Sequence, residues 1–74
     1  MLKVYTKSGS VYTFTVYGET LRCSRGMREF VVTGLDGLQV GHRLRVWGYP
    51  LNFWNEVEKD SIFFSSSPIV KIEG

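Results

Sequence analysis

The chain has 74 residues and a formal net charge of +2, with 43% hydrophobic and 22% charged residues. A chain this short forms one domain with a thin core, so we expect a single domain over residues 1–74. This length leaves no room for separate catalytic and cofactor domains. The mild charge is far from the strongly basic composition that ensures nucleic-acid affinity.

Cysteine usage and hydropathy point to the cytoplasm. Cys23 is the single cysteine, so it cannot form the internal disulfide of a secreted scaffold. Residues 1–10 lack the apolar run of a signal peptide, and no apolar run approaches the roughly 20 residues that span a bilayer. We therefore expect a soluble protein of a reducing compartment.

The first half of the chain alternates polar and apolar residues with period two, which predicts β-strands. Residues 2–7 and 11–17 are expected to form a hairpin around a turn at 8–10. A short strand at 20–24 and another at 29–33 should follow, joined by a turn at 25–28.

The second half continues in the same way. Three glycines within 34–41 predict a loop, and the alternation of 42–49 predicts a strand. Residues 51–60 fit either a short helical turn or an irregular hairpin loop. A strand at 61–65 and a last strand at 69–73 are expected, with Ser66-Ser67-Pro68 interrupting them.

Five to seven short antiparallel strands predict an all-β fold, a small single-domain barrel. A curled or closed sheet is favoured because closure removes exposed edges. SH3-like and OB-like barrels are the nearest known shapes. The OB-like shape would need a helix between its third and fourth strands, and only 51–59 could provide it.

Catalytic chemistry finds little support in the sequence. Nucleophilic catalysis needs a base and a third group that orients it, so Cys23 with His42 is better interpreted as a buried thiol and a turn histidine. A zinc site needs about four ligands. The acids Glu56, Glu58 and Asp60 fit a solvated hairpin end. We expect no enzymatic activity, no metal and no cofactor.

Three surfaces are candidates for binding. In the strand at 42–49, Leu44 and Val46 are expected to face inward, and four residues to face outward: Arg43, Arg45, Trp47 and Tyr49. This outer face suits stacking of bases and contact with phosphates, or else it covers a thin core and keeps the exterior soluble. The second interpretation is favoured.

The other two surfaces lie in predicted turns. A second basic patch, Arg22, Arg25 and Arg28, flanks a glycine turn and either clamps an anion or is a solvated turn. Phe53 and Trp54 lie in a connection, where large aromatics are unusual. They either fold back as a lid on the barrel end or anchor a partner.

Segments near the two ends of the chain resemble small uncharacterised β proteins encoded by bacteriophages and prophages, particularly of actinobacterial type. The segments are Thr6-Lys7-Ser8-Gly9-Ser10-Val11-Tyr12, then Val40-Gly41 with Leu44-Arg45-Val46-Trp47, and Ser66-Ser67-Pro68-Ile69-Val70, although those proteins usually have Thr at the position of Ser66. Residues 19–37 are not part of the resemblance. It implies a viral β protein that acts by binding, in the host cytoplasm, and it carries over no functional residues.

Two hypotheses of function follow. The first is a non-enzymatic accessory protein that works by protein–protein contact or self-association, with Trp47, Tyr49, Phe53 and Trp54 as anchors inside an arginine rim. The alternative is a single-stranded nucleic-acid-binding module that uses Arg43, Arg45, Trp47 and Tyr49 with the second basic patch. An enzyme is a third reading, and it would need a ligand-filled pocket beside Cys23 and His42.

Overall fold

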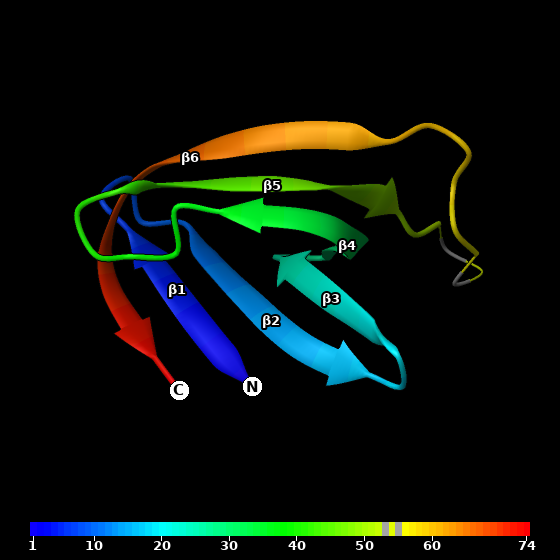
Figure 1. The fold of residues 1–74 in the computed structure, drawn as a ribbon, viewed down its shortest axis with the longest axis horizontal. Coiled ribbons are helices and arrows are strands. Elements are labelled where there is room, and N and C mark those ends of the chain that lie inside the picture. The colour runs from blue at the N-terminus through cyan, green and yellow to red at the C-terminus, as the bar shows by residue number, and fades with distance from the viewer. Residues whose placement is uncertain (53, 55) are drawn as a thin grey trace.

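The computed structural model is an all-β domain, and it describes residues 1–52, 54 and 56–74 (Figure 1). These residues contain no helix. The six strands are β1 (Leu2–Thr6), β2 (Val11–Tyr17), β3 (Thr20–Arg25), β4 (Arg28–Asp36), β5 (Arg43–Pro50) and β6 (Ile62–Glu73). Six strands fall within the expected range and confirm the predicted fold class.

The sheet closes on itself. Each strand pairs antiparallel with the next one along the chain, and β6 pairs with β1 to complete the barrel. At the closing seam Val4 lies opposite Ile72, and the two chain termini lie side by side (Figure 1). Closure pairs both outermost strands, so the barrel presents no free sheet edge.

The predicted first hairpin is confirmed. Leu2 lies opposite Phe14 and Val4 opposite Tyr12, which sets the expected residues on one face. Tyr12 and Phe14 are buried, whereas Val16 continues the same face beyond the core and is exposed. Among the described residues, the core is formed by eight buried apolar residues that come from all six strands: Val4, Tyr12, Phe14, Cys23, Phe30, Leu44, Val46 and Ile69.

The predicted loop at 34–41 begins later than expected. β4 continues to Asp36 through a bulge between Val32 and Gly34, and Gly34 lies opposite Trp47. The turn starts at Gly37, which has a φ of 73°. The expectation was wrong because a glycine inside a strand can mark a bulge as well as a turn.

The predicted interruption at Ser66-Ser67-Pro68 is also wrong, because β6 is one strand of 12 residues. Its first half pairs with β5 and its second half bends away to pair with β1 (Figure 1). A bulge lies where it changes partner, and there the Ser66 Oγ accepts a hydrogen bond from the Leu44 N–H at 3.0 Å. The serine hydroxyl therefore supplies a ladder bond at the bend of the strand.

The connection between β5 and β6 is built as an irregular hairpin loop in its described residues. An isolated bridge joins Leu51 to Val57. Inside it the Asn52 Oδ1 accepts hydrogen bonds from the backbone N–H groups of Trp54 and Glu56, each at 2.9 Å. Of the two structures expected for 51–60, the hairpin loop is the one that fits.

Candidate functional site

The outer face of β5 lies as the alternation predicts. Leu44 and Val46 are fully buried, while Arg43, Arg45 and Trp47 are exposed and Tyr49 is half-buried. The four predicted residues therefore share the exterior side of one strand.

The best-formed feature of this face is a pair of exposed rings. Trp47 lies opposite Phe63 of β6, and their ring centroids are 4.9 Å apart. The two residues are 40% and 51% exposed. On its other side the indole lies against Gly34, where an added Cβ would come within 3.1 Å of the indole Cε3. We call Trp47 and Phe63 the aromatic pair.

Phe63 was not among the residues singled out from the sequence. Its position between Ile62 and Phe64 is the available signal, because alternation along a strand puts Phe63 on the opposite face from these two apolar residues. Its pairing with Trp47 depends on the register between β5 and β6, which alternation alone does not define.

The arginines of this face are engaged within the protein. Arg45 lies opposite Asp36 and forms an ion pair with it. The Arg43 Nη1 lies 3.4 Å from the Ser66 carbonyl oxygen, which accepts its hydrogen bond. Both arginines precede Trp47 on the outer face of β5, and the charge of Arg45 is neutralised by Asp36.

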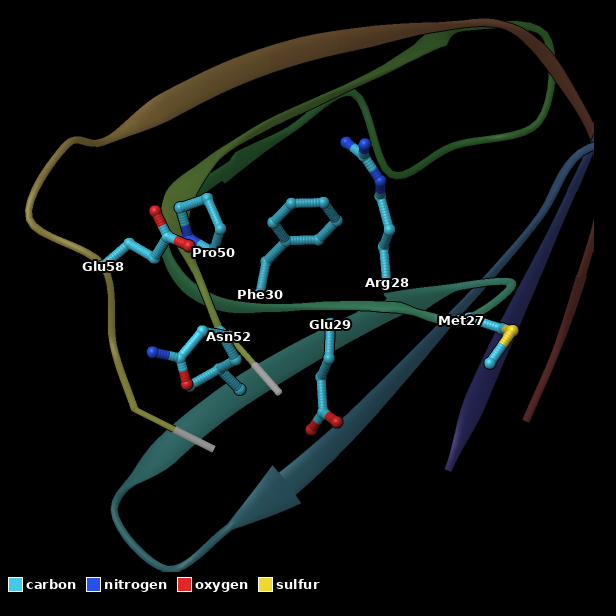
Figure 2. Close-up of a pocket in the computed structure, with 8 residues that line it drawn as sticks. Met27, Arg28, Glu29, Phe30, Pro50, Asn52 and Glu58 are labelled. Atoms are coloured by element: carbon cyan, nitrogen blue, oxygen red, sulfur yellow. The ribbon is translucent and has the colours of Figure 1, made fainter. Parts of the chain in front are cut away.

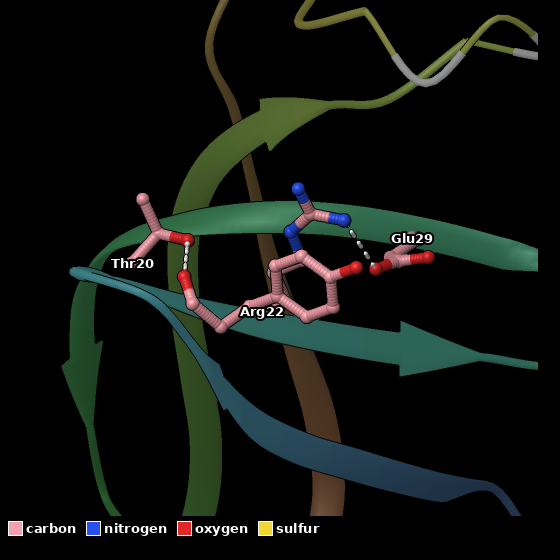
Figure 3. A network of polar contacts seen from close by, with 4 residues as sticks. Thr20, Arg22 and Glu29 are labelled. Carbon is pink, nitrogen blue, oxygen red and sulfur yellow. Dashed lines mark hydrogen bonds and ion pairs between the residues drawn. The ribbon is translucent and has the colours of Figure 1, made fainter.

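The structure does not bring the three arginines of the second basic patch together. Arg22 lies on the exterior, where its Nη1 is 3.2 Å from the Glu29 Oε1 and its guanidinium carbon lies 4.2 Å from the Tyr17 ring centroid (Figure 3). Arg25 and Arg28 share the opposite side of the sheet with Cys23 and Phe30. Alternation separates them because positions 22 and 25 differ by an odd number.

Trp54 does not act as a lid on the barrel end. Its side chain is 82% exposed, so the lid interpretation is wrong for this residue. Phe53, predicted alongside it, lies outside the described residues.

The Cys23–His42 combination lacks the features of a catalytic dyad. Cys23 is completely buried, and this burial raises the pKa of its thiol to about 12, the opposite of an activated nucleophile. His42 is exposed in the turn before β5. Across the described residues, no three His, Cys, Asp or Glu side chains lie close enough to hold a metal ion together.

Fold and surface together define a small closed β-barrel with a pair of exposed, mutually packed aromatic rings on its exterior. Comparison with protein-family models, curated proteins and solved structures finds no match for this chain. The described part of the chain has no helix with the length and hydropathy needed to cross a bilayer.

Proposed function

We propose that this protein is a non-enzymatic accessory protein that acts by protein–protein contact or self-association, and that the aromatic pair is the centre of the contact surface. The observation that carries the proposal is that Trp47 and Phe63 are exposed and yet held in place by each other and by Gly34. The resemblance of the chain-end segments supports a bacteriophage origin and action in the host cytoplasm.

Held aromatic rings are favourable anchors for a partner. A side chain that is already fixed loses little conformational entropy on binding, which is a main cost of association. Aromatic residues and arginine are also the types enriched at binding hot spots. On the outer face of β5, Trp47 has Arg45 and the half-buried Tyr49 as its neighbours along the strand, and Arg43 follows Arg45.

The charges of the barrel favour a protein partner over a nucleic acid. Phosphate binding gains its free energy from cations that replace counterions, so cations already paired with acids contribute little. Among the residues that the structure describes, three such pairs occur: Arg45–Asp36, Arg22–Glu29 and Lys71–Glu73. The formal net charge of +2 leaves a weak field for the rest of the surface.

The test compares the wild type with a W47S/F63S double variant and with V16S, a control that changes an exposed apolar residue elsewhere. Sedimentation velocity over a range of concentrations measures self-association, and affinity capture from a bacterial lysate measures contact with another protein. We expect at least one of these interactions in the wild type and in V16S, and its loss in W47S/F63S.

Three results would contradict the proposal. The first is an interaction that W47S/F63S retains in full, and the second is the absence of any interaction in the wild type. The third is tight binding of labelled single-stranded DNA or RNA that weakens steeply between two salt concentrations, because that behaviour identifies the nucleic-acid-binding alternative. Melting curves of all variants check that each is folded.

A further inference from the structure

A cleft opens at the end of the barrel, between the β3–β4 hairpin and the connection that follows β5. Its volume is about 660 Å³. It is lined by Met27, Arg28, Glu29, Phe30, Pro50, Leu51, Asn52 and Glu58 (Figure 2). Volumes of about 300–1,000 Å³ are typical of sites that take small molecules.

Two arginines are set side by side at this end of the barrel. Arg25 and Arg28 lie directly opposite each other in the β3–β4 register, and both are exposed. Figure 2 shows Arg28 on the same side of β4 as Phe30, with Glu29 on the other side. Like charges at directly opposed positions destabilise a sheet, so this pair costs stability in the absence of an anion.

Nothing within the described residues neutralises these two charges. The ion pairs of the barrel involve Arg22, Arg45 and Lys71. Arg25 instead lies over the Tyr12 ring, with its guanidinium carbon 5.7 Å from the ring centroid. A single carboxylate or phosphate can accept hydrogen bonds from more than one guanidinium, which makes such a pair suited to an oxyanion.

The floor of the cleft beside Arg28 is apolar and fixed. Phe30 is buried and packs with its ring centroid 5.5 Å from that of Phe64. Pro50 and Leu51 form the adjoining wall, and the Leu51 N–H donates to the Glu29 carbonyl at 2.9 Å. This part of the cleft offers contact to an apolar group.

The remaining wall limits the charge of a ligand. The backbone N–H of Glu58 donates to the Pro50 carbonyl at 2.8 Å, and its side chain lies at the rim beside Pro50 (Figure 2). The Asn52 Oδ1 already accepts two backbone hydrogen bonds. Glu29 also lines the cleft, but its side chain lies on the other side of β4 and pairs with Arg22. A ligand therefore finds Arg28 at one end and the acidic Glu58 at the other.

From this arrangement we propose that the cleft binds a small amphipathic anion, a carboxylate or phosphate attached to an apolar or aromatic group. Arg28, which lines the cleft, holds the oxyanion together with Arg25, which lies opposite it in the neighbouring strand and outside the lining. The apolar group lies over Phe30, Pro50 and Leu51. This site is separate from the aromatic pair, and its function does not depend on the proposed protein contact.

The test is a titration of the ¹⁵N-labelled protein followed by NMR. The probes are 3-phenylpropionate and phenyl phosphate, which carry the two oxyanions on the same ring. Benzyl alcohol supplies the ring without the charge, and inorganic phosphate the charge without the ring. We expect saturable shifts at the amides of Arg28, Phe30 and Leu51 with at least one of the two probes, and much weaker binding of both controls. The tighter probe identifies the oxyanion.

Variants separate specific binding from surface adsorption. R25Q and R28Q should each weaken probe binding about tenfold, as expected for the loss of a charge-assisted hydrogen bond. R43Q, which removes an exposed arginine from the outer face of β5, should leave it unchanged. The proposal is overturned if benzyl alcohol or inorganic phosphate binds as tightly as the probes, if the shifts lie elsewhere, or if R25Q and R28Q bind normally. W47S/F63S should bind the probe normally, because the aromatic pair is not part of the cleft. Failure of the anion-binding proposal is therefore distinguishable from failure of the proposed protein contact.

Discussion

Replacing Ser66 by alanine should destabilise the barrel at the bend of β6. Ser66 is buried, and its Oγ accepts the N–H of the fully buried Leu44 at 3.0 Å while its own hydroxyl hydrogen is donated to the Ser67 carbonyl at 2.6 Å. Alanine leaves the Leu44 N–H without a partner, and a buried unsatisfied donor costs about 1–3 kcal/mol. In a domain of this size each kcal/mol lowers the melting temperature by about 4–8 °C.

Urea denaturation and amide exchange measure this effect. S66A should lower the free energy of unfolding by about 1–3 kcal/mol and speed the exchange of the Leu44 amide. S66T keeps the hydroxyl and should lose less. The matched control S65A changes an exposed serine next to it and should stay within about 0.5 kcal/mol of the wild type. Equal stability of S66A and wild type, with Leu44 equally protected, would refute the reasoning.

Three further outcomes are expected. G48A should destabilise the barrel by at least about 2 kcal/mol in urea, because a Cβ on Gly48 would collide with the Val31 carbonyl oxygen across the sheet; a near-neutral G48A would contradict the β4–β5 register. Cys23, whose pKa burial raises to about 12, should react with a thiol reagent at pH 8 only after unfolding. Rapid labelling of the native protein would disprove the burial. An unfolded thiol ionises near pH 8.5–9, so between about pH 9 and 12 only the unfolded state loses the thiol proton. The free energy of unfolding should therefore fall as the pH rises through this range. W54A should change stability by less than about 0.5 kcal/mol because the ring is exposed, and a large loss of melting temperature would restore the lid interpretation.

Alternation was enough to predict the first hairpin and the two faces of β5. Within one strand each step reverses the side chain, so the inward positions of Leu44 and Val46 follow from the sequence alone. The same rule places Arg22 on the opposite face of β3 from Arg25. The sequence alone could therefore have shown that the second basic patch is not one continuous surface.

Bulges and long-range pairs could not be predicted. Gly34 and the stretch 66–68 have the composition of turns, yet each lies in a strand that keeps its pairing through a bulge. The aromatic pair of Trp47 with Phe63, and the ion pair of Arg45 with Asp36, depend on which strands are neighbours and in what register. Local patterning contains neither piece of information.

The outward placement of the aromatic pair depends on the closure of the sheet between β1 and β6. Backbone NOEs across this seam are its most direct test. The account predicts NOEs between the partners Lys3 and Glu73, Val4 and Ile72, and Tyr5 and Lys71. Their absence, together with rapid amide exchange along β1 and the second half of β6, would show an open sheet and contradict the account.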